Sequence, residues 1–122
     1  MSLIGEMREL GMNVDEGLER VMGDGALYEM MLGMFVTTVR DHPVSPEDFD
    51  GDSLDGLIQR VHMLKGVAGN LALTPLFSGY SQALNLLRAG DAAGARAEYE
   101  RLLPTQQAVI GRIERCQAEN RV

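Results

Sequence analysis

The sequence predicts an all-α protein, folded as an antiparallel up-down four-helix bundle with a short extra helix at its amino-terminal end. Apolar residues recur at spacings of three and four along most of the chain, which is the helical period. The segments between these stretches are short, which favours antiparallel neighbours. The 122 residues include only 5% aromatics among many Leu, Met and Ala, a composition that suits helix-on-helix packing in one domain, 1–122.

The first two helices are delimited by polar and glycine residues. Asn13 or Asp15 can cap a short helix that ends near Met22, and the Gly-Asp-Gly run at 23–25 breaks it. A longer helix is expected over about 26–41, with its methionines filling gaps in the core. The predicted apolar stripe of this helix is Leu27, Met31, Met34, Phe35 and Thr38.

The third long segment is expected to begin after a loop that contains Pro43 and Pro46. Ser53 is the natural cap, and the helix should end within residues 70–73. Its expected core stripe, with the periodicity of an amphipathic helix, is Leu54, Leu57, Val61, Leu64, Ala68 and Leu71.

Two further helices complete the predicted bundle. Thr74 followed by Pro75 is typical of a cap and a first helical residue, and this helix should reach about Arg88 before Gly90 stops it. Asp91 starts a last helix that runs toward Glu119. Pro104 lies in its middle and is expected to kink or interrupt it.

Charge and composition exclude several function classes. A net charge of −7 without a concentrated basic patch argues against nucleic acid as a partner. With no apolar run near 18 residues and no apolar leader, we expect a cytoplasmic protein that does not enter the membrane. Cys116 is the only cysteine and is interpreted as structural, and clustered metal ligands are lacking. No heptad repeat indicates self-association, so a monomer is expected.

One polar stripe interrupts the third long helix. At about 100° per residue, Gly66 lies about 40° and Gly69 about 20° from His62, with Lys65 about 60° to one side. The core stripe is centred roughly 130° away from His62 on the same estimate. His62 should therefore face water.

The two glycines need an explanation, because each costs a helix interior about 1 kcal/mol relative to alanine. One explanation is a smooth surface over which a partner can bring a reactive group to the imidazole. The other is close packing of a neighbouring helix. The sequence leaves both open.

The run from His62 to Leu71 resembles the HxLKGxxxNLG signature of histidine-containing phosphotransfer (HPt) domains of bacterial phosphorelays. Ala72 stands where the signature ends in glycine. Residues 11–18, 23–35, Leu76 and 87–91 are similar to other helices of such domains. Leu84 occupies a position where the family often has Glu or Gln near the histidine, so Gln82 and Gln59 are the candidates to replace that polar partner.

The resemblance implies that His62 accepts a phosphoryl group from the aspartate of a response-regulator receiver domain and passes it to another receiver. Lys65 would stabilise the phosphate, and the receiver would supply Mg²⁺. The chain itself would need no cofactor and would not be an enzyme, although it could form part of a hybrid sensor histidine kinase. Candidate receiver contacts are Ile58, Gln59, Met63, Gly66 and Gly69.

Two other functions stay open at this point. A helical docking or regulatory domain could bind receivers without carrying phosphate. A kinase dimerisation segment or a metal hydrolase is disfavoured, because Met63 rather than Glu follows His62 and ligand clusters are lacking. No GxxxxGK[ST] loop indicates an ATP site.

Overall fold

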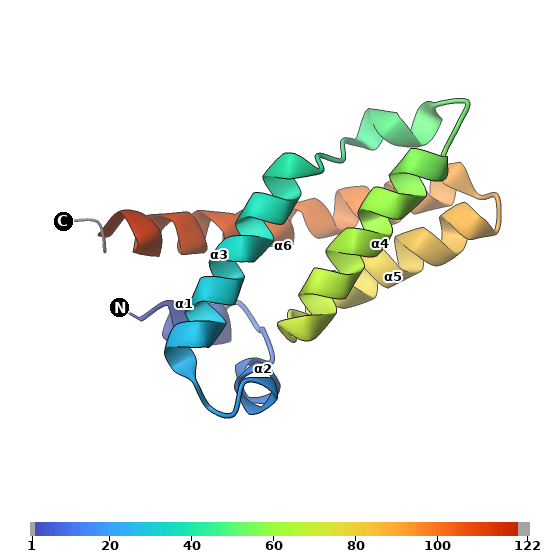
Figure 1. Cartoon of the computed structure of the whole chain (residues 1–122). Coiled ribbons are helices and arrows are strands. Elements are labelled where there is room, and N and C mark those ends of the chain that lie inside the picture. Colours follow the sequence, from blue (N-terminus) through green and yellow to red (C-terminus); the bar gives the residue numbers. More distant parts are fainter. Residues whose placement is uncertain (1, 120–122) are drawn as a thin grey trace.

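The computed structural model describes residues 2–119, and all regular secondary structure in this range is helical (Figure 1). The expected all-α class is confirmed. Residues 1 and 120–122 of the expected domain lie outside the described part. The elements are α1 (Leu3–Glu9), α2 (Val14–Arg20), α3 (Gly25–Asp41), the 3₁₀ helix η1 (Pro46–Asp50), α4 (Asp55–Asn70), α5 (Thr74–Arg88) and α6 (Ala92–Glu119).

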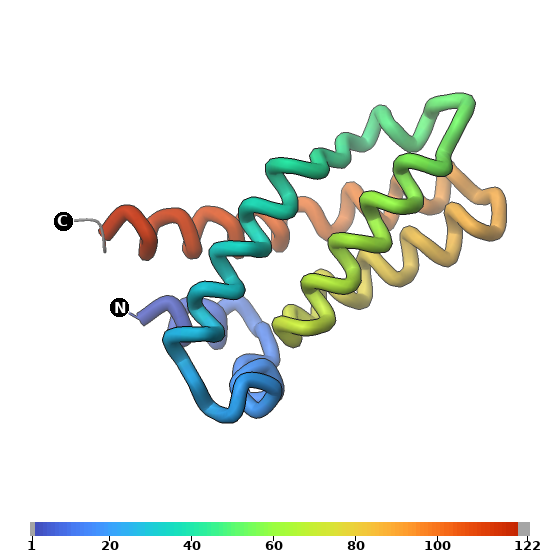
Figure 2. The backbone as a smooth tube through the Cα atoms, in the orientation of Figure 1, coloured from blue at the N-terminus to red at the C-terminus, as the bar shows by residue number. Residues whose placement is uncertain are grey.

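The long helices pack against one another in sequence order. α5 contacts both α4 and α6. α3 also contacts both of these helices (Figures 1 and 2). The short helices α1 and α2 lie at the end of the molecule where α4 finishes. The amino-terminal segment therefore adjoins the carboxyl end of α4.

The core lies where these helices meet and contains most of the aromatic residues. The chain has three Tyr and three Phe, and five of these six side chains are at most 1% exposed. Those five are Tyr28, Phe35, Phe49, Tyr80 and Tyr99. The ring centroids of Phe49 and Tyr99 lie 5.4 Å apart, so η1 is fixed onto α6. The sixth aromatic residue, Phe77, is 37% exposed.

The amino-terminal region forms two short helices where one was predicted. The Ser2 hydroxyl accepts a hydrogen bond from the Gly5 amide and caps α1, which the sequence analysis did not anticipate. Asn13 stands at the cap position of α2 as expected. Its side chain, however, donates to Glu16 at 2.8 Å instead of accepting a bond from the helix.

The apolar stripe predicted for α3 is confirmed at Phe35 and is one residue out of register at Leu27, Met31 and Met34. The buried positions are Tyr28, Leu32, Phe35 and Val36. Leu27, Met31 and Thr38 are only partly buried, and Met34 is 59% exposed. Because Leu27, Met31 and Met34 share the helical period with the true stripe, one residue out of phase, periodicity alone did not separate the two faces.

Three predicted helix boundaries need correction. Leu54, not Ser53, occupies the cap of α4, and Leu73 rather than Thr74 occupies that of α5. Pro104 does not interrupt α6, which runs unbroken over 28 residues. Pro104 and Glu100 are both exposed, so the Glu100 carbonyl that loses its helical donor can bond to water.

Gly17 allows α2 to pack closely against the rest of the fold. A Cβ at this position would lie 2.5 Å from Tyr28 Cε1 and 2.9 Å from the Leu71 carbonyl oxygen. Both neighbours are buried and one is backbone. We expect Gly17→Ala to destabilise the protein by about 2 kcal/mol through overpacking, as measured by urea unfolding.

Gly111 in α6 is the matched control for that prediction. A Cβ there would meet no neighbouring atom within 4 Å. Gly111→Ala should therefore stabilise the protein by about 1 kcal/mol through helix propensity. Equal effects of the two substitutions would contradict the packing role of Gly17.

Glu6 fastens α1 to α6. Its side chain is 4% exposed, its carboxylate accepts a hydrogen bond from Arg112, and Arg115 lies 3.4 Å away. The Arg112 hydrogen bond lowers the pKa of Glu6 below its usual 4.5, against the opposing effect of burial.

The lowered pKa makes this attachment sensitive to acid. A carboxylate with a depressed folded-state pKa contributes stability above its unfolded pKa and loses that contribution as the pH falls through the folded value. The difference in unfolding free energy between wild type and Glu6→Gln should thus be constant above about pH 5.5 and shrink below about pH 4.5. Urea unfolding across this range measures it, and a difference independent of pH would refute the assignment.

Candidate functional site

His62 projects from the middle of α4 on the side away from the core. The buried residues of α4 are Leu57, Val61, Leu64 and Ala68, whereas His62 and Gly66 are exposed. The expectation that His62 faces water is confirmed. His62 is exposed because α4 is amphipathic: its four buried apolar side chains turn the opposite face toward the core.

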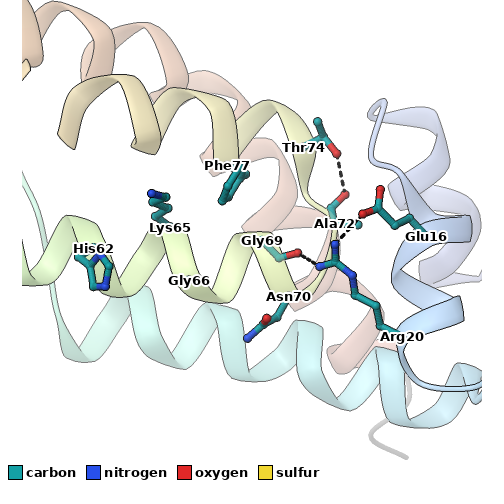
Figure 3. A pocket seen from close by; sticks show the side chains of 10 residues that line it. All are labelled: Glu16, Arg20, His62, Lys65, Gly66, Gly69, Asn70, Ala72, Thr74 and Phe77. Carbon is teal, nitrogen blue, oxygen red and sulfur yellow. Dashed lines mark hydrogen bonds and ion pairs between the residues drawn. The ribbon is translucent and has the colours of Figure 1, made fainter. Parts of the chain in front are cut away.

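His62 lines one end of a hollow of about 510 Å³ (Figure 3). Lys65, Gly66, Gly69 and Asn70 continue along α4 from the histidine. Figure 3 shows Phe77 of α5 above them and Arg20 of α2 at the far end. The remaining lining residues are Glu16, Ala72 and Thr74. The hollow thus combines an imidazole, an ammonium group and a guanidinium group.

The carboxyl end of α4 is closed by backbone hydrogen bonds from the residues that directly follow it. A helix leaves its last four carbonyls without helical donors. Here the Leu73 amide donates to the Ala68 carbonyl at 2.9 Å and the Ala72 amide to that of Gly69 at 3.1 Å. This pair of bonds is the Schellman motif, in which the residue after the cap takes a left-handed conformation.

Ala72 takes that conformation, with φ of 55°. Glycine adopts this conformation without strain, whereas an L-residue such as alanine is strained in it. The alanine methyl is buried at 4% exposure, so its burial offsets part of the strain.

Tyr28 of α3 and Asn13, the cap residue of α2, donate further hydrogen bonds to this end of α4. The Tyr28 hydroxyl donates to the Leu71 carbonyl at 2.8 Å, and the backbone amide of Asn13 donates to the Ala72 carbonyl at 3.1 Å. Burial raises the pKa of Tyr28 to about 12, so its hydroxyl stays protonated and able to donate.

Arg20 joins α2 to the hollow. Its guanidinium donates to the Gly69 carbonyl and pairs with Glu16, at 2.6 Å, one turn earlier on α2 (Figure 3). A cation at the carboxyl end of a helix is also favoured by the helix dipole. Arg20 therefore closes the far end of the hollow and stabilises the end of α4.

The hollow brings together four of the seven predicted site residues, namely His62, Lys65, Gly66 and Gly69. Ile58 is half-buried and packs against the core, while Gln59 and Met63 are exposed on α4. These three do not line the hollow.

Neither proposed replacement for the polar partner of the histidine, Gln82 or Gln59, hydrogen-bonds to His62 in the described part of the chain. Gln82 lines a different hollow between α5 and α6, with Glu98 and Arg101. Leu84 is fully buried in the core.

Sequence reasoning missed Arg20, Glu16 and Phe77. The short connection 71–73 could have placed Phe77 opposite Gly69, since it makes α5 return along α4. No local pattern marks Arg20, because its contact with Gly69 spans 49 residues.

Among residues 2–119, no group of three or more His, Cys, Asp or Glu is arranged to hold a metal ion. None of the helices described here is both long and apolar enough to span a membrane.

A scan against protein-family models finds no match to this chain, and searches of curated proteins and of solved structures find none either.

The Arg20 contact predicts a local effect on α4. Arg20→Gln should lower the unfolding free energy by about 1 kcal/mol and speed hydrogen exchange at the amides of Ala72 and Leu73. Arg101→Gln is the control, because Arg101 is 70% exposed and, among residues 2–119, its one ion pair is with Glu98 of its own helix. If Arg20→Gln left exchange at the end of α4 unchanged, the bond to Gly69 would not hold that end.

Proposed function

We propose that this protein is a phosphorelay carrier, in which His62 accepts a phosphoryl group from a receiver-domain aspartate and passes it to another receiver. One observation supports this most directly. The exposed His62 shares a hollow with Lys65 and with Gly66, where a Cβ would meet no neighbouring atom within 4 Å. An incoming domain can therefore reach the imidazole over a bare stretch of helix.

The proposed chemistry is a displacement at phosphorus. A neutral imidazole uses the lone pair of one ring nitrogen to attack, while the other nitrogen keeps its proton. The N–P bond forms as the P–O bond to aspartate breaks, and the aspartate leaves as a carboxylate. Transfer to the next receiver reverses these steps.

Lys65 supplies the positive charge in this scheme. On a helix, side chains three positions apart are neighbours, so its ammonium can approach phosphoryl oxygens on His62. Phosphoryl transfer depends mainly on positioning and charge stabilisation. The receiver would contribute Mg²⁺ and its own cationic groups, and this chain would act without an ATP site or a cofactor of its own.

The wider setting is also a proposal. α3, α4, α5 and α6 would serve as the four-helix bundle of an HPt domain, acting as a cytoplasmic monomer. Its partners would be response-regulator receivers, or those of a hybrid sensor histidine kinase. Ile58, Gln59 and Met63 would extend the receiver contact beyond the hollow.

The chain offers its own control for the phosphorylation test, because His62 and His42 are the only histidines. Incubation with phosphorylated receivers and Mg²⁺ should give acid-labile phosphate on His62, as mass spectrometry measures. His62→Gln should abolish the label. His42→Gln should retain it, since His42 lies in the connection between α3 and η1.

A panel of receivers from the same organism is needed, because receiver pairing is selective. Receiver binding without any label on His62 across that panel would refute phosphate transfer and favour a docking domain. Label retained in His62→Gln would place the chemistry on another residue.

A further inference from the structure

Phe77 is set apart from the other aromatic residues of this chain. It is 37% exposed, whereas the other five aromatic side chains are buried. Its ring lies beside the hollow that His62 lines, and the Nζ atom of Lys65 lies 5.8 Å from the ring centroid (Figure 3). This distance falls within the range of a cation–π interaction.

Gly69 makes room for that ring. A Cβ on Gly69 would lie 3.0 Å from Phe77 Cδ2 and 3.1 Å from Cε2, tighter than ordinary van der Waals contact. Gly66, by contrast, has open space around it. The two glycines near His62 therefore differ in their surroundings: Gly69 lies against an aromatic ring, whereas Gly66 faces open space. The sequence pattern does not distinguish them.

We propose that Phe77 is a positioning residue that holds the Lys65 ammonium at the hollow beside His62, and that position 69 is glycine so that the ring can lie against α4. This inference rests on the proposed function for the identity of the group that Lys65 meets. The contact between Lys65 and Phe77 does not depend on it.

The physical reason lies in the flexibility of lysine. Its ammonium is carried on a four-carbon stem with many rotamers, so a free lysine must be immobilised each time it meets an anion. The face of an aromatic ring attracts the ammonium and restricts it beforehand. Since the ring belongs to α5 and the lysine to α4, the packing of two helices sets the position of the charge.

An exposed ring could instead contact the receiver directly. The two roles differ in how they depend on Lys65. A positioning residue has no effect once the lysine is gone, whereas a contact residue acts independently of it.

The contact itself can be tested without phosphate or a partner. In NMR spectra of the full chain, the ε-methylene protons of Lys65 should be shifted upfield by the ring. Phe77→Tyr should keep this shift and Phe77→Leu should abolish it. Gly69→Ala should reduce it by displacing the ring. An unshifted Lys65 in the wild type, or a shift that survives in Phe77→Leu, would overturn the inference.

The kinetic consequence is tested with a phosphorylated receiver and Mg²⁺. Phe77→Leu should slow transfer to His62 about two- to fivefold, the range expected for an exposed cation–π contact, and Phe77→Tyr should restore the rate. Lys65→Ala should slow it further, and adding Phe77→Leu to Lys65→Ala should cause no additional loss. Circular dichroism verifies that each variant is folded.

The outcomes separate the two proposals. Additive slowing in the double variant would overturn the positioning role and assign Phe77 to receiver contact. Failure of the wild type to accept phosphate would overturn the proposed function. The NMR shift would then still decide whether the ring holds Lys65.

Discussion

The carboxyl end of α4 is the constraint on which the rest of the structure depends. Backbone amides of Ala72 and Leu73 close the helix, the Tyr28 hydroxyl bonds to the Leu71 carbonyl, and Arg20 bonds to that of Gly69. Buried carbonyls without donors are costly, so these bonds fix where the chain turns and where α5 begins. The same bonds connect α2 and α3 to the helix that bears His62.

This arrangement makes the amino-terminal segment part of the candidate site. α2 supplies Arg20 and Glu16 to the hollow, and Gly17 lets α2 approach Tyr28 and Leu71. α1 in turn is held on α6 by the buried Glu6 and its two arginines. The hollow is therefore shaped by contacts among helices that are far apart in sequence.

Glycine illustrates how neighbours decide a residue's role. Gly17, Gly66 and Gly69 all lie in helices, where glycine lowers stability. Gly17 is required by a buried ring and a carbonyl, Gly69 makes room for Phe77, and Gly66 faces open space. Of the two explanations the sequence left open, close packing accounts for Gly69, while a smooth surface fits Gly66. Spacing alone could not separate them, because it gives the angle of a residue and not what lies opposite.

The sequence by itself determined the all-α class, most helix bounds, the inward face of α4 and hence the exposure of His62. These features are predictable because they depend on short stretches of sequence, namely the apolar periodicity of each helix and the glycines that end helices. Periodicity placed the inward face of α3 correctly at Phe35 but one residue out of phase at Met31, because Met31 matches the helical period as well as the buried Leu32 does. Only the tertiary structure decided that Arg20 closes the hollow and that Phe77 lies against Lys65. Those contacts join residues of different helices. The short connection 71–73 indicates only that α5 returns along α4, and no local pattern indicates the contact of Arg20 with Gly69.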